Sequence, residues 1–314
     1  MLNVNNISFS YTDKLIISNV SFSLEKGKCL AVVGESGCGK STLLKLIYGL
    51  YDLDQGCLFW RETEVLGPKF NLIPGMEKMK YLAQDFDLMP YITVAENVGK
   101  YLSNSNFKSK KSRITELLAL VEMEEFAETK AQFLSGGQMQ RVAIARVLAL
   151  EPEVLLLDEP FSHIDTFRKN SLRRNVFSYL KEKEITCIVA THDSKDILSF
   201  SDETLVLRDG NVVIHGDTKT VYEQQIDFYT ASLFDDVNVI SSSSLGIEGD
   251  ERAVYLFPYQ LKVVSLSKLK VKVVQSYFKG NGFLIESIFL NERVFFESTL
   301  PFHTNSEVYL AIKE

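Results

Sequence analysis

A glycine-rich stretch, "GESGCGKST" at residues 34–42, constrains the fold of this 314-residue sequence more than any other feature. It follows the apolar run "CLAVV" and precedes "KSTLLKLIYGL", in which Leu43, Leu44, Ile47 and Leu50 fall on one helical face. The stretch matches the pattern G-x-x-x-x-G-K-S/T, whose glycines let backbone N–H groups turn toward phosphate oxygens. A strand, this loop and a helix in succession predict an α/β fold with a phosphate-binding loop at a helix amino terminus.

The residue types in the loop suit a nucleoside triphosphate. Lys40 is placed to reach the β- and γ-phosphates, and the Ser41 hydroxyl can ligate Mg²⁺. The alternative is a plain glycine turn between strand and helix. The residues predicted to bind nucleotide here are Gly34, Glu35, Ser36, Gly37, Cys38, Gly39, Lys40, Ser41 and Thr42.

A second motif, the acidic stretch "VLLLDEP", lies more than a hundred residues downstream of the glycine loop. The apolar run predicts a buried strand that carries Asp158 to its carboxyl end, where the carboxylate can hold Mg²⁺. Glu159 follows directly and is the candidate general base for an attacking water. Two acids that merely cap a strand are the alternative explanation.

A second glycine loop, "LSGGQ" at residues 134–138, raises the question of why one chain needs two. Its backbone N–H groups at the start of a helix form another anion site. We therefore expect two chains to face each other head to tail, each presenting this loop to the nucleotide of the other. An ordinary helix N-cap is the alternative. The candidate residues are Ser135, Gly136, Gly137 and Gln138.

Along the chain the three motifs occur in the order "GESGCGKST", "LSGGQ" and "VLLLDEP". This set resembles that of the nucleotide-binding subunit of ATP-binding cassette (ABC) transporters, and the resemblance runs from residue 1 to about 230. The resemblance implies ATP and Mg²⁺ as cofactors. It also implies that Tyr11 stacks on adenine and that Gln84 touches Mg²⁺ or the attacking water. His192 would contact the γ-phosphate, and Asp165 in "FSHID" would contact the opposite subunit, with His163 an unusual residue in that segment.

The implied fold is a P-loop nucleotide-hydrolase cassette with a parallel-sheet core, an antiparallel β subdomain and a helical insertion at about residues 86–150. Residues 1–234 form this ATP-binding domain. Residues 235–314 carry short alternating strands that predict a small β-barrel, similar to the oligonucleotide-binding-like (TOBE) barrel of importer ATPases for iron, polyamines, sulfate, molybdate or sugars. We expect the serine-rich segment at residues 241–251 to be a flexible connection.

Composition limits the partners. The net charge of −7 and a pI of about 5.3 argue against nucleic-acid binding. The four cysteines form no C-x-x-C pair, which is typical of a reducing compartment. No leader or membrane-spanning run is expected, because no apolar stretch approaches about 20 residues. The resemblance therefore implies separate integral membrane permease subunits, an extracytoplasmic substrate-binding protein and a position at the cytoplasmic face of the plasma membrane.

Other functions remain open at this stage. An exporter ATPase uses the same cassette, and a soluble ABC ATPase that acts on the ribosome or DNA shares the same chemistry. A regulatory subunit that binds ATP without turnover is disfavoured by the presence of Glu159 and His192. A GTPase is disfavoured because no N-K-x-D motif occurs. The sequence does not identify the transported substrate.

Overall fold

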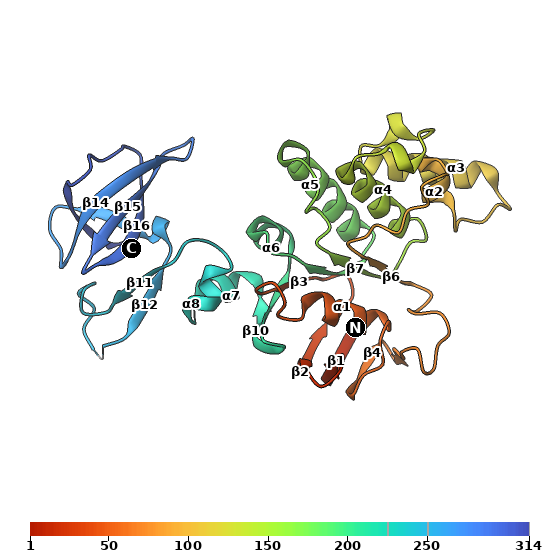
Figure 1. The fold of residues 1–314 in the computed structure, drawn as a ribbon, viewed down its shortest axis with the longest axis horizontal. Coiled ribbons are helices and arrows are strands. Elements are labelled where there is room, and N and C mark those ends of the chain that lie inside the picture. Colours follow the sequence, from red (N-terminus) through yellow and green to blue (C-terminus); the bar gives the residue numbers. More distant parts are fainter. Residues whose placement is uncertain (225, 250, 314) are drawn as a thin grey trace. The chain divides into compact units, whose positions relative to one another are not determined.

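The computed structural model describes residues 1–224, 226–249 and 251–313 and divides the chain into two compact units, Met1–Lys219 and Thr220–Glu314 (Figure 1). The first unit contains two sheets and most of the helices. Its central sheet has the strand order β10-β9-β3-β8-β7-β6, in which β9, β3, β8, β7 and β6 are parallel and β10 is antiparallel. The strands are β3 (Cys29–Val33), β6 (Met79–Leu82), β7 (Val154–Asp158), β8 (Thr186–Ala190), β9 (Glu203–Arg208) and β10 (Asn211–Asp217).

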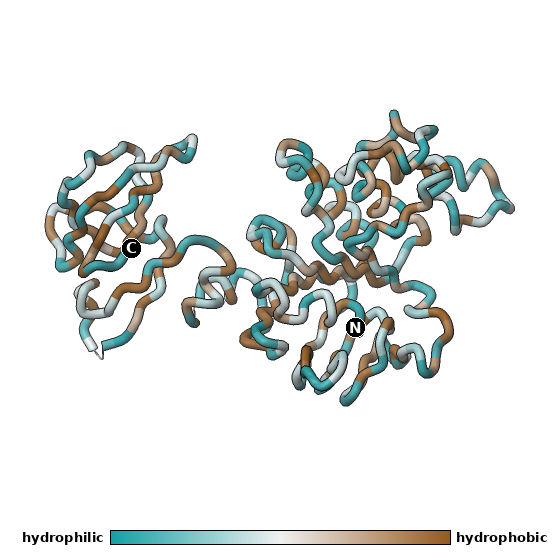
Figure 2. The backbone as a smooth tube through the Cα atoms, in the orientation of Figure 1, coloured by the Kyte–Doolittle hydropathy of each residue, from teal (hydrophilic) through white to brown (hydrophobic). Residues whose placement is uncertain are grey.

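The central strands β3, β7 and β8 are buried along their whole length, which explains why they read as apolar runs without alternation. Figure 2 shows them within a hydrophobic band through the first unit. The β9–β10 hairpin turns at Asp209 and Gly210, both with positive φ, which an Asp-Gly pair adopts readily in a tight turn. A second, antiparallel sheet has the order β2-β1-β4-β5. Its strands are β1 (Leu2–Ser10), β2 (Leu15–Leu24), β4 (Gln55–Trp60) and β5 (Thr63–Glu64).

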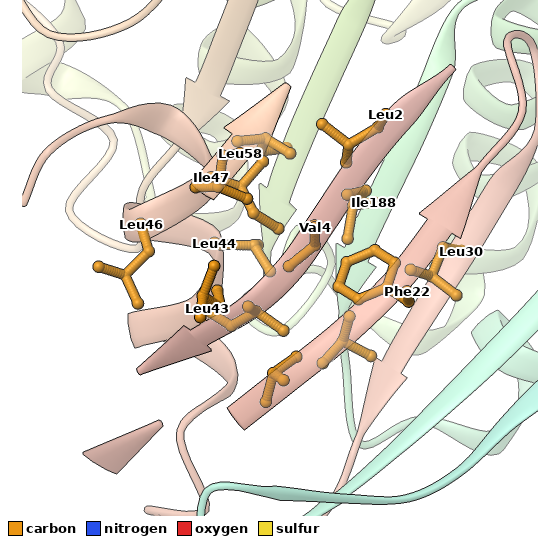
Figure 3. Close-up of a cluster of buried hydrophobic side chains, with 14 of the residues drawn as sticks. Leu2, Val4, Phe22, Leu30, Leu43, Leu44, Leu46, Ile47, Leu58 and Ile188 are labelled. Atoms are coloured by element: carbon orange, nitrogen blue, oxygen red, sulfur yellow. The ribbon is translucent and has the colours of Figure 1, made fainter. Parts of the chain in front are cut away.

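Helix α1 (Lys40–Tyr48) contributes to the core that joins these two sheets. Its Leu43, Leu44 and Ile47 are fully buried in one cluster with Val4 of the antiparallel sheet and Ile188 of the central sheet (Figure 3). Burying one such aliphatic side chain contributes about 1.5–3 kcal/mol relative to leaving it exposed. The predicted apolar face is thus confirmed for Leu43, Leu44 and Ile47, and it fixes the position of the glycine loop that precedes the helix. Leu50 was wrongly included, because the helix ends at Tyr48, where Gly49 adopts a left-handed cap.

The segment between β6 and β7 is helical, as its periodicity predicts. Thr93 begins α2 with a capping box, in which its side chain accepts from the Glu96 N–H and the Glu96 side chain accepts from the Thr93 N–H. Ser135 and Gln138 form the same capping box at the start of α4. Two further helices flank β8. The helices of this unit beyond α1 are α2 (Val94–Gly99), α3 (Phe107–Leu120), α4 (Gly136–Leu148), α5 (Thr166–Glu182) and α6 (Ser194–Phe200), with 3₁₀ turns at Glu124–Phe126 and Ala131–Phe133.

The second unit is mainly antiparallel. Its five-stranded sheet has the order β13-β17-β14-β15-β16, and the edge strands β13 and β16 come into contact, which agrees with the predicted small barrel. A β11–β12 ribbon and helix α8 (Phe228–Ser232) complete it, and helix α7 (Thr218–Gln224) begins just before it. The strands are β11 (Asn238–Ser241), β12 (Ala253–Leu256), β13 (Leu261–Val264), β14 (Leu269–Phe278), β15 (Phe283–Phe289), β16 (Glu292–Ser298) and β17 (Glu307–Ile312).

The division between the units falls at residues 219 and 220, earlier than the expected boundary after residue 234. Aromatic packing explains the difference. The Tyr222 ring of α7 stacks on Phe257 at a centroid distance of 4.9 Å, and Phe234 meets Tyr222 edge-on at 5.4 Å. The Tyr222 hydroxyl also donates to the Tyr259 hydroxyl at 3.1 Å. These contacts place the segment after Lys219 with the β strands that follow it.

The serine-rich segment that we expected to be a flexible connection lies inside the second unit, where it joins β11 to β12. Its serines hydrogen-bond one another, with Ser241 Oγ and Ser244 Oγ 2.8 Å apart. Backbone bonds close the turn, because Ser242 N–H donates to the Arg252 carbonyl at 2.9 Å. The small polar side chains therefore form a hydrogen-bonded turn here rather than a linker between units.

Candidate functional site

Four predicted site segments follow four neighbouring parallel strands. The glycine loop follows β3, His192 follows β8, Asp158 ends β7, and Gln84 lies two residues beyond the end of β6. These strands are adjacent in the sheet in the order β3-β8-β7-β6. Because parallel strands end at the same edge, the topology brings the four segments together at the carboxyl edge of the sheet, where α/β proteins bind their ligands.

The glycine loop curls around the ammonium group of Lys40. Lys40 Nζ donates to the carbonyl oxygens of Gly34 at 2.6 Å and of Glu35 at 2.9 Å. Gly39 has φ +112°, and a Cβ there would lie 2.8 Å from Ile17 Cδ1. The conformation and the lack of space both require glycine at this position. The loop thus ends in the amino terminus of α1, whose free N–H groups and helix dipole favour an anion.

Ser41 and Asp158 meet as the predicted metal site requires. Ser41 Oγ donates to Asp158 Oδ1 at 3.0 Å, and Tyr81 donates its hydroxyl proton to Asp158 Oδ2 at 3.1 Å. Asp158 is only 3% exposed. Burial of the Tyr81 ring, together with the Asp158 charge beside it, raises the pKa of this phenol well above its usual value. A hydroxyl and a carboxylate side by side are the oxygen donors that Mg²⁺ prefers, so these residues fit that ion with water and phosphate oxygens completing its shell.

Glu159 and His192 form a direct pair. His192 Nδ1 and Glu159 Oε1 are 2.8 Å apart. The Glu159 side chain is 17% exposed, whereas that of His192 is 72% exposed. The pair therefore places one carboxylate at the same edge of the sheet as the glycine loop, with its neighbouring imidazole open to solvent or to a ligand.

A buried ion cluster holds the loop that carries His192. Asp193 Oδ2 accepts from Arg173 and from Lys169 Nζ, the latter at 3.1 Å, and both cations belong to α5. Arg173 Nε also lies 2.5 Å from Asp196 Oδ1 in an ion pair, and Thr191 Oγ1 donates to Asp196 Oδ2 at 2.9 Å. The residues on both sides of His192 are therefore anchored to α5.

The segment at residues 134–138 begins α4. Ser135 Oγ accepts from the Gln138 N–H at 3.3 Å, and Gln138 Oε1 accepts from the Ser135 N–H at 2.8 Å. The ordinary capping role considered for Ser135 is thus present. Gly136 has open space where a Cβ would stand, whereas a Cβ on Gly137 would lie 2.7 Å from the His163 carbonyl oxygen. The amino end of α4 therefore lies against the loop that follows Glu159.

The remaining predicted residues lie at the periphery. Tyr11 is 50% exposed, and its hydroxyl is 3.2 Å from Thr42 Oγ1 at the start of α1. Gln84 is exposed in the turn after β6. Asp165 is exposed at the N-cap of α5. His163, whose place in its segment is unusual, meets the Phe86 ring edge-on at a centroid distance of 5.4 Å.

The sequence analysis did not identify three residues that shape this site. Tyr81 bonds the predicted metal-binding carboxylate, Gln140 bonds the backbone after β7, and Arg173 clamps the His192 loop. Gln140 stands two residues after the second glycine loop, and this spacing was the available signal. No pattern in the sequence marks Tyr81 or Arg173 as a site residue, because tyrosines are common in strands and arginines are common in amphipathic helices.

In the described part of the chain, no three histidine, cysteine or acidic side chains cluster as a protein metal site would require. A metal ion at Ser41 and Asp158 would therefore depend on a nucleotide for further oxygen ligands. No helix among the described residues is long and apolar enough to cross a membrane.

Comparisons with known proteins agree with this geometry. Residues 17–162 match the family model described as "ABC transporter". The spermidine/putrescine import ATP-binding protein PotA of Pasteurella multocida is 32% identical over 284 residues, which cover 86% of this chain and 75% of that protein. The Fe(3+) ions import ATP-binding protein FbpC 2 of Rhodococcus jostii is 36% identical over 282 residues, 84% of this chain and 80% of that protein.

Solved structures give the same result. An ATP-binding cassette solved as a dimer in a post-hydrolysis state with ADP and phosphate superimposes with a TM-score of 0.61 and 28% identity, covering 69% of this chain and 99% of that chain. The cbiO1 protein of Clostridium perfringens, part of the ABC transporter complex cbiONQ, superimposes with a TM-score of 0.63 and 27% identity, covering 71% of this chain and 91% of that chain.

Proposed function

Because this chain belongs to the ABC transporter family and matches its import ATP-binding proteins over most of their length, we propose that it is the ATP-hydrolysing subunit of a membrane importer. One observation carries the proposal. The glycine loop, the Ser41–Asp158 contact and the Glu159–His192 pair lie at one edge of a single sheet. One edge of the sheet therefore carries a phosphate-binding loop, oxygen ligands for a cation and a carboxylate that can act as a general base.

We assign the residues these roles. Backbone N–H groups of residues 34–42 and the Lys40 ammonium bind the β- and γ-phosphates of ATP, and Tyr11 stacks on the adenine. Ser41, Asp158 and Gln84 would hold Mg²⁺, which would neutralise charge on the transferred phosphate. Glu159 takes a proton from the attacking water on its Oε2 atom while Oε1 remains bonded to His192. The imidazole fixes the direction of that carboxylate and faces the γ-phosphate.

We further propose that two copies associate head to tail, with residues 135–138 of each completing the nucleotide site of the other. The support is that the amino end of α4, a 13-residue helix, provides a second anion site that one nucleotide per chain does not require. ATP binding would then close the pair, and hydrolysis would reopen it.

The helical insertion is the proposed contact with the permease. A hollow of about 620 Å³ between α2 and α3 is lined by Ile92, Phe107, Ile114 and Leu118, among others, and Phe107 is 76% exposed. Such an apolar surface suits a helix of a membrane partner. The segment after Gln84 is a second candidate for this contact, and within it Met89 is 38% exposed, whereas Phe86 also packs on His163 within the chain.

Importer function also implies a substrate-binding protein outside the membrane and a position for this chain at the cytoplasmic face. PotA is named for polyamines and FbpC for iron(III), so the similarity does not select one substrate. The acidic net charge of −7 supports the absence of a nucleic-acid partner.

Co-purification from gently solubilised native membranes tests the proposal. We expect the tagged protein to bring down a polytopic membrane protein, whose identity would point to the substrate and direction of transport. Recovery only in the soluble fraction with ribosomal or DNA-repair proteins would contradict the transport function and leave the ATPase chemistry intact.

A further inference from the structure

Gln140 connects helix α4 to the loop that carries Glu159. Its side chain is 2% exposed and uses both ends of its amide. Gln140 Nε2 donates to the Glu159 carbonyl oxygen at 2.9 Å, and Gln140 Oε1 accepts from the His163 N–H at 3.0 Å. One side chain on the second turn of α4 thus hydrogen-bonds the loop at two points, at Glu159 and at His163, which lie on either side of Ser162.

The Glu159 backbone needs such support. Its φ is +51°, in the left-handed region that residues other than glycine, asparagine and aspartate rarely adopt. A conformation of this kind is unfavourable for a glutamate and persists only where the surroundings impose it. The Glu159 N–H donates to the Ala190 carbonyl at 2.9 Å, and its own carbonyl accepts from Gln140. The Glu159 carbonyl also accepts from Ser162 Oγ at 3.1 Å and from the Ser162 N–H at 3.3 Å, both within the loop. The bonds to Ala190 and Gln140 are those that tie this peptide, which directs the Glu159 carboxylate toward His192, to β8 and α4.

The same loop also touches the start of α4. Gly137 has no room for a Cβ beside the His163 carbonyl oxygen, so α4 and the loop are in contact at its first turn as well as at Gln140. Contact at two successive turns of one helix means that a displacement of α4 is transmitted to the Glu159 peptide. The amino end of α4 is also the anion site proposed to meet the nucleotide of the second copy.

We propose that Gln140 is a positioning residue for hydrolysis, which holds the Glu159 carboxylate in its productive orientation and makes that orientation depend on the position of α4. The inference rests on the proposed function, in which Glu159 is the base. In the head-to-tail pair, capture of ATP by α4 of one chain then sets the base in that chain's own nucleotide site. Gln140 thereby couples the two sites of the pair.

The near-isosteric variant Gln140→Met removes both hydrogen bonds and tests this role in the full-length protein. We expect kcat to fall about tenfold, since the variant loses the hydrogen bonds that orient a group that acts only in the transition state. The Kd for ATP should stay within about twofold, because Gln140 does not contact the phosphate loop. The Hill coefficient for ATP should fall toward 1. Gln132→Met, at an exposed position, is the matched control.

A kcat within twofold of the unmodified protein would overturn the proposal. A fall in kcat accompanied by an equal loss of ATP affinity would also overturn it, because that result indicates general damage to the fold. If Gln140→Met does not fold, the second variant described next supplies the test.

Gln140→Glu gives a pH-dependent readout that a purely structural role would not. A protonated Glu side chain can donate to the Glu159 carbonyl and accept from the His163 N–H, whereas an ionised one cannot donate. Burial at this position is expected to raise the pKa of the introduced carboxyl. The ratio of variant to unmodified kcat should therefore rise as the pH is lowered from about 8 to about 6. The neighbouring titratable groups Glu159, His163 and His192 occur in both proteins, and the introduced carboxyl acts on them through its charge only when it is ionised. Both that effect and the loss of the donor therefore disappear as the pH is lowered, and the ratio approaches the value for a neutral donor.

A ratio that is independent of pH would contradict the donor role. Glu159→Gln in the same assay separates the two hypotheses. If Glu159→Gln is inactive and Gln140→Met is normal, only the role of Gln140 is wrong. If Glu159→Gln hydrolyses ATP normally, the base itself has been misassigned.

Discussion

Removal of Arg173 is the perturbation whose cost can be worked out most directly from the structure. The Arg173 side chain is 3% exposed, and so is its partner Asp196, with 2.5 Å between Nε and Oδ1. Arg173→Met keeps much of the buried length but leaves the Asp196 carboxylate without its cation. Breaking a buried ion pair on one side costs about 3–5 kcal/mol.

Protonation limits this cost. Burial raises the pKa of Asp196, and Arg173 opposes that effect, so removing Arg173 raises this pKa further and makes the carboxyl easier to protonate. A carboxyl that takes up a proton no longer carries an unpaired buried charge, and each unit of pKa shift corresponds to about 1.4 kcal/mol. Protonation therefore keeps the cost near the lower end of the range of about 3–5 kcal/mol. We therefore expect a loss of about 3 kcal/mol in the free energy of unfolding of the first unit. The Asp193 carboxylate loses one of its two cations as well, but it retains Lys169.

Urea unfolding followed by tryptophan fluorescence measures this loss. Trp60 is the only tryptophan of the chain, is 5% exposed, and belongs to the first unit, so its signal reports that unit alone. With a slope of about 3 kcal/mol per molar urea, the midpoint should fall by about 1 M. Arg174→Met is the matched control, because its side chain is exposed. The double variant Arg173→Met/Asp196→Asn should recover part of the loss, since it removes the orphaned charge.

A midpoint shift below about 0.3 M for Arg173→Met, or one equal to that of Arg174→Met, would refute the reasoning. Such a result would mean that the buried cluster contributes no more to stability than an exposed ion pair.

Two further predictions concern the neighbouring loops. Burial raises the pKa of the Asp193 carboxyl, but hydrogen bonds from Arg173 and Lys169 outweigh it and hold this pKa at about 2. A carboxyl whose pKa is lowered by folding contributes stability that is present above its unfolded pKa of about 4 and is lost as the pH falls toward 2. Thermal melts should show this decline, and Asp193→Asn, which keeps the helix cap, should flatten it; an unchanged decline would exclude this group as its source. Gly39→Ala should weaken ATP binding at least about tenfold, because its Cβ would clash with Ile17 at a strained φ. Titration with a fluorescent nucleotide measures this, and an unchanged Kd would show that the loop tolerates a side chain.

Much of the fold follows from local patterns in the sequence. The strand before Gly34, the apolar face of α1 and the buried strand that ends at Asp158 depend on composition and spacing within ten residues or so. The structure places each where the pattern predicts it. The Ser41–Asp158 contact is consistent with this topology, because β3 and β7 are parallel strands of one sheet, separated only by β8, and end at the same edge.

The polar contacts that orient the site could not be predicted in the same way. A glutamine or arginine within an amphipathic helix usually faces solvent, and only the packing of α4 and α5 buries Gln140 and Arg173. The left-handed backbone of Glu159 likewise has no local signal, since it depends on partners from α4 and β8. The division between the compact units at residues 219 and 220 has no local signal for a related reason, because stacking of Tyr222 on Phe257 joins residues 35 positions apart.

The measurement that tests the central claim most directly is the mass of the Glu159→Gln variant in solution, determined by light scattering with and without ATP and Mg²⁺. If Glu159 is the base and residues 135–138 complete the site of a second copy, this variant binds ATP, does not hydrolyse it and accumulates as a dimer. Without nucleotide it is a monomer. A variant that stays monomeric with saturating ATP, or that turns ATP over at the normal rate, would contradict the proposed head-to-tail hydrolytic pair.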